Sequence, residues 1–314
     1  MPNFIVIVNL KAGSGEAAEV WPQLQQELKQ AQIHYTAHIS EYAGHAIALA
    51  EKISTEATAP TVLIVVGGDG TVNQVLNGVR RSENPNTPIA YFPAGSGNDF
   101  ARSLNLTKNA GEFVKQLKET TQATPLNIFD VNITDSENPI YRQQKFLINN
   151  FGIGFDAHVV HLTENSTTKT NLNRWHIGNL AYIANILTVF KRQQPFKLTV
   201  FGEKTEYFEH AYLTTMTNIA YFGGGVKIVP TADPREREID LIVIEKPSTP
   251  RFLKLFGQIL TNGHHLQSPY VHLFKADQIR YEIEPAQYGQ MDGEDMGKHR
   301  FQISAVNAQH PFWI

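Results

Sequence analysis

The fold of this chain is decided by Thr61-Val62-Leu63-Ile64-Val65-Val66-Gly67-Gly68-Asp69-Gly70-Thr71, a stretch in the first third of the sequence. Residues 61–66 form a continuous, mostly apolar run, which predicts a buried β-strand. The three glycines after it let the backbone turn sharply and approach a ligand closely, because no Cβ stands in the way. Residues 72–81 then predict a helix, whose N-terminal N–H groups and dipole favour a phosphate at this turn.

Two polar side chains stand within the turn. Asp69 can orient a metal ion or a water, and Thr71 can cap the helix or donate a hydrogen bond to a phosphate. The turn is not a Walker A loop, because no Gly-Lys-Ser/Thr follows, and it lacks the Gly-x-Gly-x-x-Gly of a dinucleotide fold. It therefore predicts a phosphate cradle of another type, with an ordinary tight strand-to-helix turn as the alternative.

Strand and helix signals alternate around this stretch as far as residue 125. Strands are predicted at 4–8, 34–39, 61–66 and 89–92, and helices at 16–31, 44–56, 72–81, 99–104 and 111–119. Such alternation with continuous apolar strands is typical of a parallel sheet with helices on both faces. We therefore predict an α/β domain over residues 1–125.

The pattern changes after Pro125. Strands are predicted at 127–134, 145–150, 197–201, 206–218, 238–244 and 278–283, with two helical stretches at 179–191 and 250–262. Strand following strand without a helix between them indicates an antiparallel sheet or β-sandwich. We predict a second, all-β domain over residues 126–314, whose extreme C-terminal tail packs back on the first domain.

A second glycine turn, Pro93-Ala94-Gly95-Ser96-Gly97-Asn98-Asp99, follows the strand predicted at 89–92. In a parallel sheet, turns at the carboxyl ends of neighbouring strands face one crevice, where ligands bind. Asn9 and Gly13 follow the first strand and Ser40 ends the second, so they face the same crevice. This convergence of small, polar and glycine residues predicts a nucleotide site, although Ser40 taken alone is more often just a capping residue.

Composition excludes several classes of function. The 27 basic and 30 acidic residues give a net charge of −3, so composition shows no electrostatic footprint for nucleic acid. With no cysteine, the chain has no disulfide framework and no thiolate metal site. The N-terminal residues lack a secretory-signal pattern, and the apolar stretch 177–190 is too short to cross a bilayer. We expect a cytoplasmic protein whose contact with a membrane is peripheral.

Together the motifs resemble the diacylglycerol kinase catalytic family of soluble bacterial lipid kinases, to which sphingosine and ceramide kinases are related. Residues 9–13 look like the family's Asn-Pro-x-x-Gly opening, with Leu10 in place of proline. Residues 67–73 match its hallmark Gly-Gly-Asp-Gly-Thr and continue it through Val72 and Asn73. Residues 93–102 resemble its Pro-x-Gly-Thr-x-Asn-Asp-Phe-Ala-Arg segment, with Ser96 keeping the hydroxyl of the threonine.

The likeness continues through the second half of the chain. Residues 150–157 are similar to the family's Gly-x-Gly-x-Asp-Ala, residues 223–232 match a shared glycine-rich stretch, and Asp292-Gly293-Glu294 resembles its Asp-Gly-Glu. The resemblance implies an NAD kinase-like α/β domain that binds ATP and a β-sandwich that completes the substrate cleft. The predicted nucleotide-binding residues are Asn9, Gly13, Ser40, Gly67, Gly68, Asp69, Gly70, Thr71, Val72, Asn73, Gly95, Ser96, Asn98 and Asp99.

By this resemblance the chain is an ATP-dependent lipid kinase that phosphorylates a hydroxyl of a membrane lipid, with diacylglycerol, giving phosphatidic acid, the leading substrate. Such a transfer needs Mg²⁺ on the phosphates and a carboxylate that takes the proton of the acceptor. Asp292 and Glu294 stand two residues apart, so in an extended backbone both point to one face. The resemblance favours Glu294 as proton acceptor, with Asp292 and Asp69 as the other catalytic carboxylates; a solvated acidic turn is the alternative for residues 292–294.

One acidic segment departs from the family pattern. Family members place a structural Mg²⁺ near an Asp-Asp-Gly run, where this chain reads Ala232-Asp233-Pro234-Arg235-Glu236-Arg237-Glu238-Ile239-Asp240. By position Asp233, Glu236 and Glu238 would hold the ion. Arg235 and Arg237 could instead replace it by pairing with those acids.

Other interpretations stay open at this point. NAD kinases share the Gly-Gly-Asp-Gly-Thr turn, but their Asn-Asn-Glu motif is absent here, because Phe151 follows Asn149-Asn150. A catalytically silent lipid-binding regulatory protein is a third possibility, supported by the altered acidic segment alone. Residues 174–192 bracket an apolar stretch with basic and aromatic residues, which suits either a membrane surface at the inner leaflet or packing on the sheet. A homodimer would fit the family.

Overall fold

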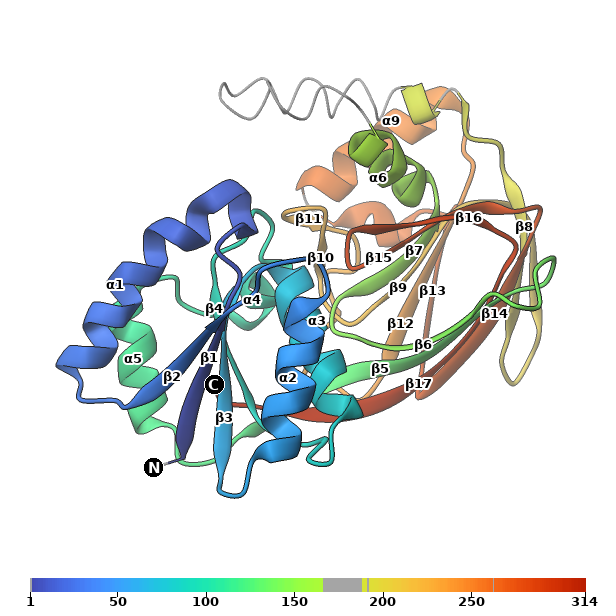
Figure 1. Cartoon of the computed structure of the whole chain (residues 1–314). Coiled ribbons are helices and arrows are strands. Elements are labelled where there is room, and N and C mark those ends of the chain that lie inside the picture. The colour runs from blue at the N-terminus through green and yellow to red at the C-terminus, as the bar shows by residue number, and fades with distance from the viewer. Residues whose placement is uncertain (1, 166–187, 191, 262) are drawn as a thin grey trace.

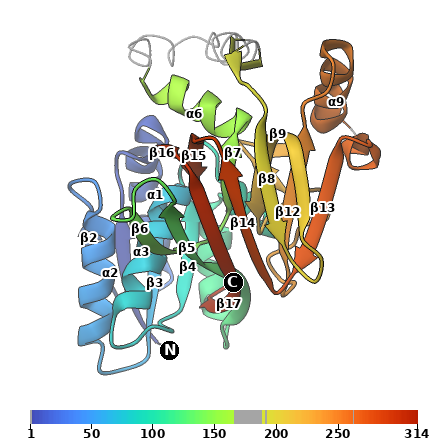
Figure 2. The ribbon, with the colours of Figure 1, turned by 90° about the vertical axis from the view of Figure 1, so that its right-hand side faces the viewer.

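We describe the protein from a computed structural model that defines residues 2–165, 188–190, 192–261 and 263–314 (Figure 1). An N-terminal α/β part and a C-terminal β-sandwich part lie side by side (Figures 1 and 2). This arrangement confirms the fold class predicted from the sequence. The predicted helix at 179–191 and the basic and aromatic segment 174–192 fall mostly outside the described residues.

Four parallel strands form the sheet of the α/β part, in the order β2-β1-β3-β4. Their bounds are Asn3–Val8 for β1, Tyr35–Ile39 for β2, Thr61–Gly67 for β3 and Ile89–Pro93 for β4. Every residue of β3 is buried, because its odd-numbered and even-numbered side chains pack into two cores on opposite faces of the sheet. The apolar run that starts the deciding stretch is therefore the centre of this sheet.

Helices cover both faces of the parallel sheet (Figure 1). On one face lie α1 (Glu16–Gln30) and α5 (Ala110–Glu119), and on the other α2 (His45–Glu56) and α3 (Asp69–Arg81). The short helix α4 (Asp99–Leu104) follows β4, and a 3₁₀ turn, η1 (Ala12–Gly15), follows β1. The predicted elements of this part are thus present with small shifts of their ends.

Antiparallel strands build the second part. The strands are β5 (Thr124–Asp135), β6 (Arg142–Leu147), β7 (Asn150–Gly154), β8 (Phe196–Phe201), β9 (Glu206–Thr217), β10 (Tyr221–Phe222), β11 (Val226–Lys227), β12 (Ile239–Glu245), β13 (Val271–Ala276), β14 (Gln278–Glu284), β15 (Gln287–Met291), β16 (Glu294–His299) and β17 (Phe301–Phe312). Two helices, α6 (Phe155–Asn165) and α9 (Thr249–Thr261), lie at one end of these strands with the 3₁₀ turn η2 (His264–Gln267) (Figure 1).

A ribbon of two paired strands, β5 and β17, joins the two parts, with β6 along the other edge of β5 and β14 along the other edge of β17. Strands β5 and β17 pair antiparallel over their whole length, from Phe301 opposite Asp135 to Phe312 opposite Thr124. At its end β17 runs parallel to β4, where Phe312 faces Ile89. The next residue, Trp313, donates its backbone N–H to the carbonyl of Ile89 at 2.8 Å. The last residues of the sequence thus lie in the α/β part, while β5 runs across the boundary predicted at residue 125.

Several elements of the second part were not expected from the sequence. Helix α6 and strands β15, β16 and β17 were not predicted, although β17 begins with an alternation of buried and more exposed residues, and the strand predicted at 145–150 is divided between β6 and β7. The turn between β15 and β16 is the segment Asp292-Gly293, where both residues have positive φ, at 48° and 86°. Such Asp-Gly turns match the twist of a hairpin, and here the turn joins β15 to β16 with Met291 paired to Glu294. Among the described residues, no helix is long and apolar enough to span a bilayer.

Candidate functional site

The two glycine turns of the α/β part pack backbone against backbone. A Cβ added to Gly95 would lie 2.4 Å from Cα of Gly68, closer than real Cβ atoms approach a backbone. The N–H of Ala94 donates to the carbonyl of Gly67 at 2.7 Å, which fixes the turns side by side. Glycine at 68 and 95 is therefore required by close approach, and the two turns form one continuous backbone surface.

The residues predicted from the first two strand ends lie beside these turns. Asn9 donates from Nδ2 to Oγ1 of Thr71 at 3.1 Å, and Gly13, at φ 62°, faces the carbonyl of Ala94. The N–H of Ser40 donates to the carbonyl of Val8 at 2.8 Å, so Ser40 ends β2 next to the start of the same crevice. The carboxyl ends of β1, β2, β3 and β4 thus meet as expected for a parallel sheet.

Within the second turn, the side chain of Asn98 holds the turn itself. It accepts the N–H of Gly95 at 2.9 Å and the hydroxyl of Tyr91 at 3.1 Å, and it donates back to the carbonyl of Gly95 at 2.5 Å. Asn98 is buried and adopts a left-handed backbone at φ 53°. Ser96, in contrast, is exposed. Asn98 therefore shapes the turn, and Ser96 is the residue available to a ligand.

Asp69 links the first turn to the start of helix α4. Its carboxylate accepts the N–H of Asp99 at 2.8 Å and the N–H of Phe100 at 3.3 Å. Burial raises the pKa of Asp69 to about 6, against the hydrogen bonds that lower it, and the neighbouring charge of Asp99 raises it further. Asp69 thus sits in a desolvated position where its protonation changes near neutral pH.

Asp99 connects the α/β part to the glycine loop of the β-sandwich. It accepts the N–H of Gly224 at 2.8 Å and pairs with Arg102 at 2.5 Å. Gly224 and its neighbours Gly223 and Gly225 all have positive φ, at 84°, 60° and 121°. Burial raises the pKa of Asp99 as well. The glycine loop at 223–225 therefore closes over the second turn from the other part of the molecule.

Asp292 is the most firmly held of the predicted catalytic carboxylates. One oxygen accepts the N–H groups of Asn149 and Asn150 at 3.2 and 2.9 Å, and the other accepts Nδ2 of Asn73 at 2.6 Å. Burial raises the pKa of Asp292 to about 7 although the amides lower it, and the charge of Asp69 adds to the rise. Since the two charges influence each other, residues 69 and 292 belong to one acidic site.

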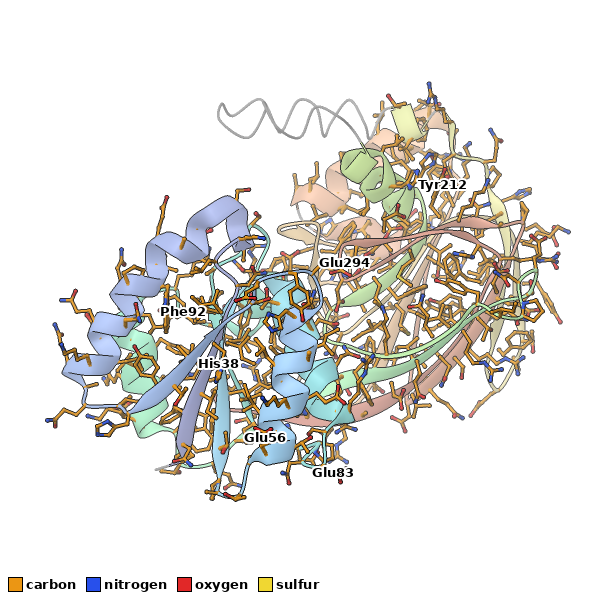
Figure 3. The ribbon with its side chains drawn as sticks, viewed as in Figure 1. His38, Glu56, Glu83, Phe92, Tyr212 and Glu294 are labelled. Carbon is orange, nitrogen blue, oxygen red and sulfur yellow. The ribbon has the colours of Figure 1, made fainter. Side chains whose placement is uncertain are left out.

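Glu294 follows the turn Asp292-Gly293 and also lies near the first glycine turn. Its Oε1 is 3.6 Å from the position that a Cβ on Gly70 would take, at the start of α3. Figure 3 shows Glu294 at the junction of the two parts of the molecule. Unlike Asp292, Glu294 is exposed. The structure therefore brings the glycine turn near the N-terminus and the acidic hairpin near the C-terminus together.

The network around Asp292 contains residues that sequence reasoning did not assign. Asn77 on α3 donates to the carbonyl of Phe146 at 2.8 Å and accepts its N–H at 3.0 Å, which ties the helix to β6. The amides of Asn149 and Asn150, Gly224 and the guanidinium of Arg102 were likewise not assigned. Backbone N–H donors cannot be recognised from a sequence. The Asn149-Asn150 pair before the Gly-x-Gly motif is the one sequence signal that could have identified these donors.

Comparisons with known protein families decide the family of the chain. A model described as the diacylglycerol kinase catalytic domain matches residues 3–129. A model described as the YegS C-terminal NAD kinase beta sandwich-like domain matches residues 151–308, half of the chain. The chain belongs to the diacylglycerol kinase catalytic-domain family. The deciding stretch of the sequence lies inside the first match and the Asp-Gly-Glu hairpin inside the second.

Relatives in this family resemble the chain over nearly its whole length. The protein named "Putative lipid kinase YtlR" of Bacillus subtilis (strain 168) is 29% identical, covering 97% of each chain. The "Diacylglycerol kinase" of the same organism is 24% identical, covering 92% of this chain and 88% of the relative. These proteins support a kinase family membership without fixing the substrate of this chain.

Solved structures support the fold. A structure titled "Crystal structure of a putative diacylglycerol kinase from Bacillus anthracis str. Sterne" superposes with a TM-score of 0.72 at 22% identity, covering 99% of this chain and 94% of the other. The yeast NADH kinase complexed with NADH superposes with a TM-score of 0.51 at 12% identity, covering 99% and 83%. The diacylglycerol kinase family member described here therefore has an NAD kinase-like fold.

The predicted structural Mg²⁺ site does not fit the residues present. Asp233 pairs with Arg235 at 3.3 Å, whereas Glu236 and Glu238 contact Lys275 instead. Among the described residues, no group of three or more His, Asp or Glu side chains is arranged to hold a metal ion. The prediction of Asp233, Glu236 and Glu238 as joint ligands is therefore corrected, because Asp233 pairs with Arg235 whereas Glu236 and Glu238 share the ammonium of Lys275.

Proposed function

We propose that this chain is an ATP-dependent lipid kinase, which transfers the γ-phosphoryl group of ATP to a hydroxyl of a membrane lipid. Diacylglycerol, which would give phosphatidic acid, is the leading substrate. Family membership supports the kinase class, and relatives named diacylglycerol kinase support the substrate. The joined glycine turns and the acidic site opposite them supply the parts that phosphoryl transfer needs.

A largely apolar cavity in the β-sandwich part is the observation that best supports a lipid substrate. Helices α6 and α9 and the strands β9 and β12 contribute most of its walls. The lining residues are Phe155, Asp156, Val159, Val160, Tyr212, Leu213, Phe222, Gly223, Val226, Ile228, Ile244, Phe252, Leu255, Phe256, Ile259, Leu260 and Gln290. Such a wall suits an acyl chain, whereas a second nucleotide would need many polar partners.

The cavity is linked to the acidic site by hydrogen bonds. Gln290 donates from Nε2 to Oδ2 of Asp156 at 3.1 Å and to Oδ1 of Asn150 at 2.6 Å. The N–H of Asn150 in turn donates to Asp292. Gly223 lines the cavity, and the N–H of the following Gly224 binds Asp99. A lipid with its tail in this cavity would therefore present its hydroxyl toward the acidic site.

Each part of the site has a role in the proposed transfer. Backbone N–H groups of the two glycine turns would hold the phosphates, with the dipole of α3 behind them. Mg²⁺ binds to proteins through one or two carboxylates together with substrate phosphates, and Asp69 and Glu294 are placed to supply them. Asp292, oriented by three donors and with a pKa of about 7, would take the proton of the lipid hydroxyl.

A membrane contact follows from the position of the cavity. Leu260 lines the cavity and is 54% exposed, and Leu253 on the same helix is 55% exposed. Arg251 and Lys254 are exposed beside them. Exposed leucines flanked by bases suit a membrane surface with anionic headgroups. We therefore place the protein at the inner face of the cytoplasmic membrane, with α9 toward the lipid.

A kinase assay with several acceptors tests this function. Purified protein receives labelled ATP and Mg²⁺ with vesicles of diacylglycerol, ceramide, a sphingoid base or an alkylated glycerol, or with NAD in solution. Label in a lipid supports the proposal, and sedimentation with the same vesicles reports the membrane contact. Label in NAD alone would establish an NAD kinase, and calorimetric ATP binding without turnover would favour a silent regulatory protein.

The pH dependence of activity follows from Asp292. Since burial raises its pKa to about 7, the carboxyl is protonated and unable to accept a proton below that pH. We expect kcat/KM to rise with pH through about 7 and to level off above it, with Asp292→Asn lacking this inflection. A pH–rate profile with saturating ATP measures it. A flat wild-type profile between pH 6 and 8 would exclude this residue as the base.

The cavity can be tested by partly filling it. Val160→Trp on α6 would occupy space lined by the helix, so we expect KM for long-chain diacylglycerol to rise about tenfold or more. KM for ATP should be unchanged, and a short-chain diacylglycerol should be affected less. Ile140→Trp, at a position 92% exposed, is the control. Equal effects on short and long chains would show that the tail binds elsewhere.

A further inference from the structure

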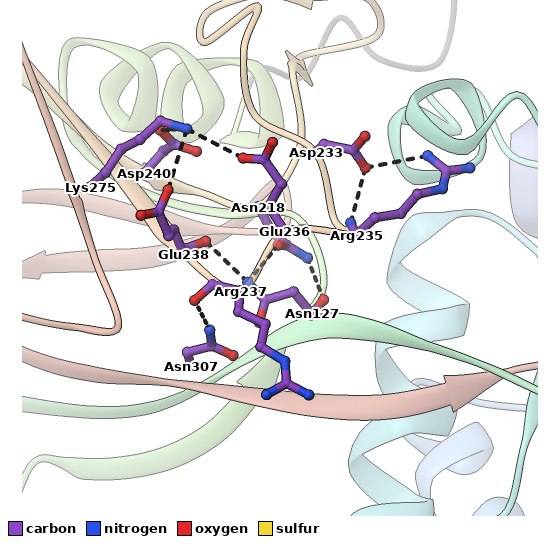
Figure 4. Close-up of polar contacts among 10 residues, drawn as sticks. All are labelled: Asn127, Asn218, Asp233, Arg235, Glu236, Arg237, Glu238, Asp240, Lys275 and Asn307. Atoms are coloured by element: carbon purple, nitrogen blue, oxygen red, sulfur yellow. Dashed lines mark hydrogen bonds and ion pairs between the residues drawn. The ribbon is translucent and has the colours of Figure 1, made fainter.

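A lysine ammonium lies among three carboxylates beside strand β12 (Figure 4). Nζ of Lys275 is 3.5 Å from Glu236, 3.7 Å from Glu238 and 3.5 Å from Asp240. Lys275 on β13 is paired directly with Asp240 on β12 in the sheet. The register of these two strands therefore sets the position of the ammonium group, independently of the loop at 233–238.

We propose that Lys275 is the resident cation of this acidic loop and takes the place that a divalent metal ion would otherwise fill. The side chain of Asp240 is only 5% exposed, and a carboxylate so buried needs a partner charge. Nζ donates a hydrogen bond to Glu236 and lies within ion-pair distance of Glu238 and Asp240. A metal ion would have to displace Nζ from the same oxygens, so the wild-type loop has no vacancy for one.

Arg235 and Arg237, the two arginines that could have replaced the ion, contact other residues. Arg235 stays beside Asp233 within its own turn (Figure 4). The guanidinium of Arg237 donates to Gln309 at 3.1 Å. Within the described part of the chain, Glu236 and Glu238 pair with Lys275 and not with either arginine. The cation comes instead from a strand about forty residues later in the sequence.

The loop that Lys275 holds is connected to the acidic site. The carbonyls of Pro234 and Glu238 accept the backbone N–H and Nδ2 of Asn127 at 2.6 and 3.1 Å. Asn127 also donates to the side chain of Asn218 at 3.1 Å, and the N–H of Asn218 donates to the carbonyl of Asn149 at 2.8 Å. Loss of the ammonium should therefore loosen the junction between β5 and the strands beside the acidic site.

Thermal unfolding without nucleotide tests the proposal. Wild-type protein should have the same Tm in chelator and in Mg²⁺, Ca²⁺ or Mn²⁺. Lys275→Met should lower Tm in chelator by about 4 °C or more, because it leaves the buried carboxylate of Asp240 without a partner charge, and a divalent ion should restore part of the loss. Lys197→Met, which breaks an exposed pair with Glu209, is the control and should leave Tm unchanged.

Two further variants and one crystal structure distinguish metal binding at the Lys275 site from metal binding at the acidic site of Asp69 and Asp292. Adding Glu236→Gln to Lys275→Met should abolish the rescue by metal, and Lys275→Arg should keep most of the wild-type Tm. Manganese-soaked crystals of the wild type should show no anomalous peak among the three carboxylates. Such a peak, or a wild-type Tm that falls in chelator as much as the variant's, would overturn the proposal, even where Lys275→Met does not fold.

Discussion

Asp292→Asn should lower kcat for lipid phosphorylation by ~10²-fold or more, the loss expected when a general base is removed. The amide cannot take the proton of the lipid hydroxyl, and it places an N–H₂ group among donors that now point at carboxylate oxygens. Glu294→Gln tests the other carboxylate of the hairpin, and we expect a loss of this size from at least one of the two variants. Binding of ATP should remain, because the glycine turns are untouched.

Steady-state kinetics with calorimetric ATP binding measures this prediction. Asp130→Asn, which alters an exposed contact between Asp130 on β5 and Gln144 on β6, is an isosteric control outside the site. A fall in kcat with unchanged ATP affinity would show that the altered carboxylate acts in the chemical step and not in ATP binding. If both hairpin variants keep wild-type kcat, the acidic hairpin has no part in the reaction.

Gly95→Ala should weaken ATP binding by about 10- to 100-fold, as expected when a methyl group is forced into a close backbone contact. The new Cβ would lie 2.4 Å from Cα of Gly68 and 2.9 Å from Oδ1 of Asn98. Neither neighbour can move away easily, because Gly68 precedes α3 and the side chain of Asn98 holds the turn. The two turns would separate, and the phosphate surface that they share would be lost.

Gly257→Ala provides the matched control for this change. Gly257 lies in α9, and a Cβ there would meet nothing within 4 Å. Titration of each variant with ATP, together with Tm, separates loss of the binding surface from loss of the fold. An ATP affinity for Gly95→Ala close to wild type would mean that phosphate binds away from these turns.

The α/β part could be predicted from the sequence because its signals are local. The buried strand β3 reads as an unbroken apolar run, and glycines mark both turns that follow the central strands. Parallel topology then places the turns at one edge without further information. Local signals could not place Asp292 and Glu294 beside Gly70, because more than two hundred residues separate them from it. Only the family resemblance predicted that these parts of the chain lie close together.

What could not be predicted depends on contacts between distant strands. Strands β15 and β16 contain Gly289 and Gly297 and few apolar residues, so their pairing is set by neighbours and not by propensity. The lining of the apolar cavity comes from helices and strands spread over a hundred residues. The role of Lys275 could not be predicted from the sequence either. Only the register of β12 and β13 places its ammonium group beside Asp240.

The ribbon of β5 and β17 has a consequence for how the chain folds during synthesis. Ile89 on β4 meets its partner, Phe312, only after the ribosome has added more than two hundred further residues. Until then the edge of the nascent parallel sheet is open, and it is a candidate for binding by a chaperone or for pairing with another nascent chain. The α/β part therefore cannot be completed until β17 has been synthesised.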